Sequence, residues 1–273
     1  VGAVLNVKGT ENVRKLQEIA VKETRLGIPL LFGYDVIHGH KTLFPIPLGE
    51  AASWDLAAIE TSARTAAIEA SAAGINWTFA PMVDITRDAR WGRVMEGAGE
   101  DTYLGTKIGL ARIKGFQGDD LAANNTIIAC AKHFAGYGFA EAGRDYNTVD
   151  VGTSTLYNTI LPPFKAAVEA GVQTVMNSFN TLNGVPATGN KWLQRDILKD
   201  AWKFNGFVVS DWGSGMEMID HGFAANLKQV AEQSANAGSD MDMESYAYVN
   251  HLKELVETGK VDIKLVDDAV RRI

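Results

Sequence analysis

The chain of 273 residues lacks the features of disulfide-stabilised, membrane-spanning and nucleic-acid-binding proteins. Its single cysteine, Cys130, cannot form an internal disulfide and lies in an apolar run, which predicts a buried thiol. No apolar stretch approaches the length that crosses a bilayer. The net charge of -7 and the pI near 5.3 argue against nucleic acid as the main partner. We therefore expect neither a membrane nor a nucleic acid among its partners.

The composition is that of one globular domain, with 46% hydrophobic and 22% charged residues. The chain starts at Val1 inside a predicted strand, without an initiator methionine, and stops at Ile273 within a helical pattern. These ends lead us to expect that residues 1–273 form a single catalytic domain, and that this domain is a fragment of a longer multidomain chain.

Short apolar runs alternate with stretches of helical spacing along the whole chain. This alternation predicts a parallel sheet covered by helices, and hence an α/β fold of the (β/α)8 TIM-barrel type. The strand candidates are residues 1–7, 30–32, 75–80, 126–131, 173–176, 206–209 and 239–243. A barrel needs an eighth strand. We expect the first strand to be missing, or supplied before Val1.

A carboxylate follows the sixth of these runs. The tripeptide Ser210-Asp211-Trp212 ends residues 206–209, which are apolar, rich in β-branched residues and bounded by glycine. Such a strand is typical of a buried parallel sheet, and α/β barrels keep their chemistry at the carboxyl-terminal rim. The alternative is that Asp211 caps the next helix. Functional groups at other strand ends favour the first interpretation.

The second strand candidate and the loop after the third also lead into polar residues. Asp35 follows residues 30–32, where it suits either a turn cap or hydrogen bonding to sugar hydroxyls. The loop after residues 75–80 contains Arg93 and Glu96. Long loops over a rigid barrel are often functional, although a salt-bridged surface loop has the same composition.

Two adjacent basic residues, Lys132 and His133, end the fourth strand candidate. Basic groups at the end of a buried strand are unfavourable unless an acid or a ligand pairs with them. They therefore indicate either a binding site or a structural ion pair with Asp84 or Asp211.

Taken in order, these motifs resemble glycoside hydrolase family 3, and most closely its bacterial β-glucosidases. Any one motif is weak, but several in the right order, each beside a predicted strand end, are specific. The resemblance covers the chain from about Val1 to Ile273. The matching segments are residues 33–39, 79–84, 90–93 with Glu96 and Glu100-Asp101, 132–134, 146–150, 183–188 and 209–213.

The resemblance implies a retaining, exo-acting β-glycosidase that releases terminal non-reducing β-D-glucose. Asp211 matches the nucleophile, which forms a covalent glycosyl-aspartate. Asp35 matches the acid that binds the outer hydroxyls of the terminal sugar, and Asp rather than Glu at this position favours glucose. Arg93, Lys132 and His133 match the basic cluster that binds the other hydroxyls and keeps nearby carboxylates ionised.

Two further positions match residues at the edge and the floor of the pocket. Trp212 matches an aromatic wall for the neighbouring sugar. Met176 matches a residue on the pocket floor, although a methionine after a strand is more often part of the core. Phe179 departs from the family, which often has tyrosine there.

No His-Asp pair follows Lys132-His133, so the resemblance implies a general acid from a following α/β sandwich domain of the same protein. It also implies a carbohydrate substrate, no cofactor and no metal. The resemblance suggests a periplasmic or secreted protein, while the sequence itself leaves the compartment unknown.

Two other functions remain open. His38 and His40 form an H-x-H pattern like that of metal-dependent barrel hydrolases, in which Lys132 could bridge metals and Asp211 could be a ligand. This pattern follows the second strand candidate rather than the first, and two of the five histidines fall in helical or turn segments. A non-catalytic sugar-binding barrel is the third interpretation.

Overall fold

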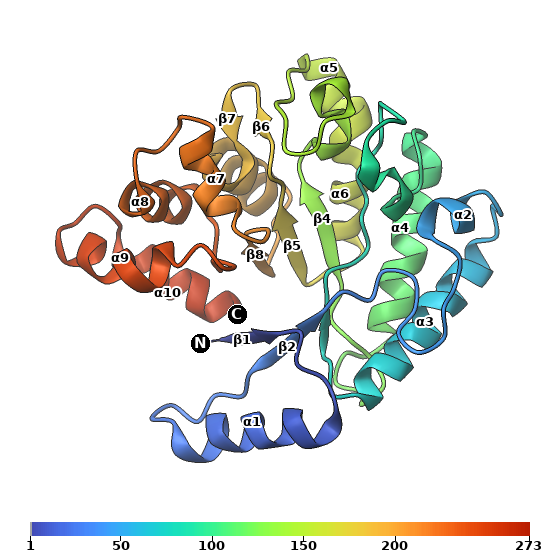
Figure 1. Ribbon diagram of the computed structural model, residues 1–273, viewed down its shortest axis with the longest axis horizontal. Coiled ribbons are helices and arrows are strands. Elements are labelled where there is room, and N and C mark those ends of the chain that lie inside the picture. Colours follow the sequence, from blue (N-terminus) through green and yellow to red (C-terminus); the bar gives the residue numbers. More distant parts are fainter. Residues whose placement is uncertain (1) are drawn as a thin grey trace.

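The computed structural model describes residues 2–273 and shows a parallel sheet with helices packed along its outer side (Figure 1). Six strands build the main sheet and two form a small antiparallel hairpin. The main strands are β1 (Ala3–Leu5), β2 (Leu31–Tyr34), β3 (Trp77–Thr78), β4 (Cys130–Phe134), β5 (Thr174–Asn177) and β8 (Phe207–Val209). The hairpin strands are β6 (Thr181–Leu182) and β7 (Val185–Pro186).

The main strands follow one another in sequence order, and every pairing is parallel. β1, β2 and β3 are paired in that order, as are β4, β5 and β8. A parallel bridge from Trp77 to Ile128 connects the two groups, and a bridge from Val209 to Met241 adds the last predicted run. The predicted α/β fold is therefore confirmed, and all seven predicted runs contribute to the sheet, the last by the single residue Met241.

Helices fill most of the intervals between strands, as the helical spacing predicts. The α-helices are α1 (Thr10–Glu23), α2 (Pro47–Ala51), α3 (Leu56–Ala72), α4 (Thr102–Gln117), α5 (Thr153–Thr155), α6 (Leu161–Glu169), α7 (Ser214–Asp220), α8 (Leu227–Ala237), α9 (Ala247–Glu257) and α10 (Ile263–Arg272). A 3-10 helix spans Gly92–Glu96, and π-helical turns span Leu156–Ile160 and Trp192–Ala201. No helix within residues 2–273 is both long and apolar enough to cross a membrane.

Small side chains allow α3 and α4 to pack closely. The buried face of α3 is made largely of alanine, including Ala63 and Ala67. At Gly115 of α4 an added Cβ would lie 2.6 Å from the Cβ of Ala63 and 2.5 Å from the carbonyl oxygen of Glu60. Only glycine fits there, so this contact fixes the distance between the helices and the position of the loops that they support.

The inner face of the sheet is filled by apolar side chains from most strands. This inner cluster contains Trp77, Phe79, Cys130, Met176, Phe207, Val209 and Met243. Cys130 is fully buried, which confirms the predicted buried thiol. The cluster supports the strand ends from below.

β1 pairs with β2 on one side only, within residues 2–273. A groove of about 660 Å³ lies along its other side, bounded by residues 2–6 and by the segment that contains Met241 and Met243. Both ends of the described chain lie beside it (Figure 1). The first strand was expected to be missing, or supplied before Val1 outside the described residues, and this stays a prediction.

Candidate functional site

The polar residues singled out at the strand ends come together at the carboxyl-terminal rim. Lys132 and His133 lie within β4, and Asp211 is the second residue after β8. The loop after β3 is fixed against β4, because the Val83 amide donates to the Lys132 carbonyl at 2.8 Å. Since the carboxyl ends of parallel strands meet at one edge, these side chains share one face.

His133 is fully buried between two carboxylates. Its Nδ1 lies 2.8 Å from Oδ2 of Asp84, and its Nε2 lies 3.4 Å from Oδ2 of Asp211. Burial, together with the charges of Arg93 and Lys132, holds the pKa of His133 well below its usual value. Burial raises the pKa of Asp84 to about 7. The structural pair with Asp84 that the sequence left open is therefore present, and it leaves the other ring nitrogen facing Asp211.

Asp211 is 8% exposed, and its Oδ2 lies beside Nε2 of His133. Oδ1 accepts a 2.6 Å hydrogen bond from the Trp212 amide. Oδ2 has no hydrogen-bond partner among the described residues. α7 begins after Gly213 without a side-chain cap, which rules out the capping role considered from sequence. Burial raises the pKa of Asp211 to about 6, while Lys132, the Trp212 amide and Arg93 oppose the rise.

A chain of alternating charges surrounds this carboxylate. Arg93 donates to both oxygens of Glu96, at 2.6 and 3.0 Å. Glu96 lies 3.6 Å from Nζ of Lys132, which in turn lies 3.7 Å from Asp35. The side chains of Arg93 and Glu96 are only 22% and 19% exposed. The loop is therefore not the solvated surface loop that its composition alone allowed.

These contacts keep the charges in place. Burial raises the pKa of Glu96, but the hydrogen bond from Arg93 and the charge of Lys132 outweigh it and leave the pKa below its usual value. Burial lowers the pKa of Arg93, but Glu96 outweighs it and raises the pKa overall. Both side chains are thus ionised at neutral pH, and the cations remain available to stabilise Asp211.

The remaining predicted site residues lie at different depths. The Asp35 side chain is 58% exposed, at the open end of the charge chain. Trp212 is 53% exposed beside Asp211, and its role as an aromatic wall stays a prediction. Met176 is 2% exposed and belongs to the inner cluster, so it supports the site from below rather than presenting a free surface. The pocket-floor role of Met176 stays a prediction.

The comparisons with known proteins agree on one family. Residues 1–273 match the Glycosyl hydrolase family 3 N terminal domain over their whole length. The chain belongs to this family. It is 45% identical to the periplasmic beta-glucosidase of Salmonella typhimurium, over 100% of this chain and 36% of that protein. It is 36% identical to a beta-xylosidase of Formosa agariphila, over 96% of this chain and 39% of that protein.

Solved structures give the same result. The crystal structure of a beta-glucosidase from Listeria innocua in complex with glucose superimposes with a TM-score of 0.97 and 46% identity. That alignment covers 100% of this chain and 38% of the other chain. The resemblance noted from the motifs is therefore confirmed, and the family 3 domain spans just over a third of the length of these relatives.

An aromatic layer beside the candidate site residues was not predicted. Tyr137 lies edge-to-face against His133 and beneath the Arg93 guanidinium, which is 5.6 Å from its ring centre. Trp91 packs on Tyr137 and donates to Asp145 at 2.8 Å. Trp91 is far from Tyr137 and Asp145 in the sequence, and no motif pointed to these contacts.

Phe179, where family members often have tyrosine, completes this layer. Its ring packs against Tyr146 and Tyr137 at centroid distances of 4.8 and 5.7 Å. The carbonyl oxygen of Phe179 lies 3.1 Å from Nε2 of His221. Although Phe179 lacks the tyrosine hydroxyl, it still contributes ring packing and a backbone hydrogen-bond acceptor.

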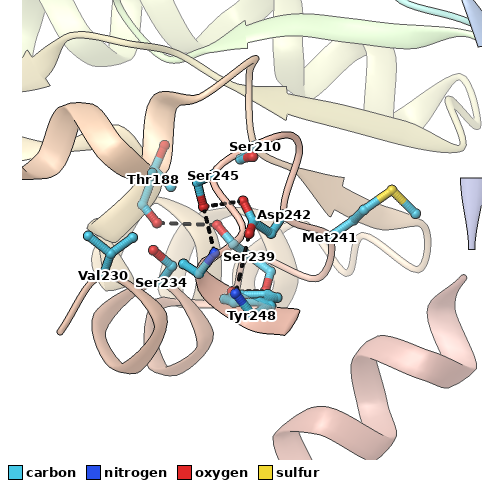
Figure 2. A pocket seen from close by; sticks show the side chains of 11 residues that line it. Thr188, Ser210, Val230, Ser234, Ser239, Met241, Asp242, Ser245 and Tyr248 are labelled. Carbon is cyan, nitrogen blue, oxygen red and sulfur yellow. Dashed lines mark hydrogen bonds between the residues drawn. The ribbon is translucent and has the colours of Figure 1, made fainter. Parts of the chain in front are cut away.

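A hydroxyl-rich network beneath β8 positions the nucleophile candidate (Figure 2). The Ser210 hydroxyl accepts from the Met243 amide at 2.8 Å, and Ser245 donates to Asp242 at 2.6 Å. Tyr248 donates to the Ser239 carbonyl at 2.8 Å. These groups surround a cavity of about 10 Å³, the size of one water molecule. The network anchors residues 239–248 under β8 and so fixes the backbone next to Asp211.

The histidines of the H-x-H pattern do not converge with the other site residues. Nδ1 of His38 lies 3.0 Å from the Phe44 carbonyl oxygen, and His40 packs edge-to-face on Tyr34. Residues 2–273 contain no group of three or more His, Cys, Asp or Glu side chains that could hold a metal ion. The metal-dependent alternative is therefore not favoured.

Proposed function

We propose that this domain bears the nucleophile and the glucose-binding residues of a retaining, exo-acting β-glucosidase. The observation that supports this most is the Asp211 carboxyl group, buried at a strand end with Oδ2 unpartnered among residues 2–273. A buried carboxylate oxygen without a partner is unfavourable, and a substrate atom can provide the missing contact. Membership of family 3 agrees with this assignment.

In the proposed mechanism Asp211 attacks the anomeric carbon and forms a glycosyl-aspartate, as the glycosidic bond breaks. This step requires Asp211 to be ionised. Its pKa of about 6 allows that at neutral pH, because Lys132, the Trp212 amide and Arg93 counteract burial. Water then cleaves the intermediate, so that the product keeps the β configuration.

The proposed sugar-binding residues surround this carboxylate. Asp35 is exposed and lies 3.7 Å from Lys132, so a sugar hydroxyl can bind both groups. Arg93 and His133 offer further donors, while Trp212 provides an apolar wall. Relatives include both beta-glucosidases and beta-xylosidases. We infer glucose, because the acid at position 35 is Asp rather than Glu.

The acid that protonates the departing oxygen is inferred to come from a further α/β sandwich domain of the same protein. The matched relatives are more than twice as long as this chain, which leaves room for such a domain. By the same comparison we propose a periplasmic or secreted location, since the Salmonella relative is named periplasmic.

The test uses the intact protein, with any chain that flanks these residues. We expect hydrolysis of 4-nitrophenyl β-D-glucoside in preference to the β-D-xyloside. NMR during the first turnovers should show β-glucose before α-glucose appears by mutarotation. Initial release of α-glucose would refute the retaining mechanism. Binding of glucose without hydrolysis of either glycoside would indicate a non-catalytic sugar-binding barrel.

A further inference from the structure

Asp84 is a buried carboxylate to which the proposed mechanism assigns no role. Its side chain is 2% exposed, and one oxygen, Oδ2, makes both of its contacts with His133. That oxygen accepts the His133 backbone amide at 2.8 Å and lies 2.8 Å from the ring Nδ1. The same carboxylate therefore fixes the backbone of β4 and the orientation of the imidazole.

The opposite end of the imidazole faces the nucleophile candidate. Nε2 of His133 and Oδ2 of Asp211 are 3.4 Å apart. Both atoms are buried, and neither has a hydrogen-bond partner in the part of the chain that the structure describes. Whether this contact is attractive depends on whether Nε2 holds a hydrogen, because a bare nitrogen lone pair would repel the carboxylate oxygen.

Proton counting separates the possible arrangements. If Asp84 is ionised and the ring is neutral with its hydrogen on Nδ1, then Nε2 is bare and repels Asp211. If one more proton is present and Asp211 is ionised, as a nucleophile must be, that proton lies between Oδ2 of Asp84 and Nδ1 of His133. Wherever it sits between these atoms, Nε2 has a hydrogen that points at Asp211.

We propose that Asp84 is a positioning residue: by sharing one proton with Nδ1 of His133, it keeps a hydrogen on Nε2 directed at Asp211. This role depends on the proposed function of Asp211 as nucleophile. Nε2 then holds the Asp211 carboxylate in a fixed orientation, and because the contact is long, at 3.4 Å, the same hydrogen can be shared with a substrate hydroxyl. No proton needs to leave the pair during the reaction.

The surrounding charges agree with this arrangement. The charged groups that act on the pair are Arg93, Lys132, Glu96 and Asp211 itself. Burial raises the pKa of Asp84 to about 7, and burial with Arg93 and Lys132 lowers that of His133. Both effects favour a protonated Asp84 donating to Nδ1, with the ring hydrogen on Nε2.

Asp84→Asn in the intact protein tests this role. One side-chain oxygen must serve both the His133 amide and Nδ1. If the oxygen of the introduced asparagine takes that place, the amide stays paired but the neutral ring is forced to leave Nε2 bare. We expect kcat/KM for an aryl β-glucoside to fall about 10- to 150-fold near pH 7, the effect of losing one hydrogen bond to a charged group.

The pH profile separates positioning from a general structural effect. In Asp84→Asn a ring protonated at low pH recovers the hydrogen on Nε2, with Nδ1–H donating to the amide oxygen. The ratio of variant to wild-type kcat/KM should therefore rise as the pH falls, by up to about tenfold per pH unit. A ratio that does not change with pH would overturn the proposal.

Two variants serve as controls. Asp240→Asn alters another buried carboxylate. Asp240 accepts a hydrogen bond from the Val208 backbone amide at 2.8 Å, but it pairs with Lys199 away from the site. Its ratio to wild type should not change with pH. In a His133→Gln background, Asp84→Asn should lower kcat/KM by less than about twofold, because its effect passes through His133. A full additional loss in that background would contradict the proposal.

Neutron diffraction from crystals of the intact wild-type protein in heavy water gives a readout that depends on neither activity nor the folding of a variant. We expect deuterium on Nε2 of His133 at pH 7, and deuterium between Nδ1 and Oδ2 of Asp84. Nε2 without deuterium would overturn the proposal. This measurement remains decisive if the protein proves not to be a glucosidase, so the two failures are distinguishable.

Discussion

Replacing Glu96 by glutamine should weaken activity while making the nucleophile more acidic. Glu96 accepts two hydrogen bonds from Arg93 and lies 3.6 Å from Nζ of Lys132. Glutamine has nearly the same shape but offers one acceptor and no charge. One of the two bonds from Arg93 is lost, and the amide NH2 is placed against a cation.

The size of the effect follows from the type of bond removed. A hydrogen bond between charged groups contributes about 1.5–3 kcal/mol, and the pair is about four-fifths buried, so solvent screens it little. If the loss affects the transition state alone, kcat/KM falls by about 10- to 150-fold. Glu60→Gln is the matched control, because the ion pair of Glu60 with Lys114 is exposed. That variant should stay within about twofold of wild type.

The assay measures kcat/KM of the intact protein for 2,4-dinitrophenyl β-glucoside. The leaving group of this substrate departs without a proton. The acid limb of this profile reports the ionisation of the free enzyme. Without the Glu96 charge, Lys132 and Arg93 act on Asp211 uncompensated and lower its pKa. The acid limb should therefore move to lower pH while the plateau falls. An acid limb that moves to higher pH, or an unchanged plateau, would refute this account of the charge chain.

Four further results are expected. Asp211→Asn should raise the melting temperature above pH 6. Burial raises the pKa of Asp211 from 3.8 to about 6, so the wild-type protein loses about 1–3 kcal/mol of stability as the pH rises through that range, and the uncharged variant does not. A lower melting temperature would contradict this. Glu50→Gln should destabilise the domain by about 3–5 kcal/mol in chemical denaturation, since it leaves buried Arg112 without its counter-charge; a loss under about 1 kcal/mol would refute the pairing. Chelation should leave activity unchanged, whereas loss restored by zinc would revive the metal-dependent alternative. Residues 1–273 alone should give a burst with the dinitrophenyl glucoside, faster release with azide and little cellobiose hydrolysis. Rapid cellobiose hydrolysis would place the general acid within these residues. Glu217 would then be the first candidate, because burial and the charge of Asp211 raise its pKa to about 7.

The fold was largely predictable because strand periodicity and βα alternation are local signals. Each predicted run takes part in the sheet in sequence order. The last run was the least well predicted, since residues 239–243 form only a bridge at Met241 and are held instead by side chains such as Asp240, which pairs with Lys199. That pairing joins distant segments, which periodicity does not detect.

Part of the site could also be inferred from the cost of burying charge. Lys132 and His133 at the end of a buried strand required acids, and the acids named from sequence, Asp84 and Asp211, are those that contact His133. The two acids that lie beside Lys132, Glu96 and Asp35, were not named from the sequence as its partners. Glu96 pairs with it only because the 3-10 turn at Gly92–Glu96 directs this side chain inward beside Arg93.

The aromatic layer was beyond sequence reasoning for a different reason. Trp91 and Asp145 are 54 positions apart and belong to separate loops, so no period connects them. The burial of Met176 was easier to predict, because Thr174 and Met176 share one face of β5. The Thr174 hydroxyl accepts from the Trp77 indole at 3.0 Å in the interior. This alternation places Met176 in the inner cluster.

The identity of the nucleophile is the central claim, and covalent trapping tests it most directly. The intact protein is incubated with 2,4-dinitrophenyl 2-deoxy-2-fluoro-β-glucoside, digested and analysed by peptide mass spectrometry. The account predicts one label per molecule, on Asp211, with time-dependent loss of activity and no labelling of Asp211→Ala. A label on any other carboxylate, or full activity in Asp211→Ala, would contradict it.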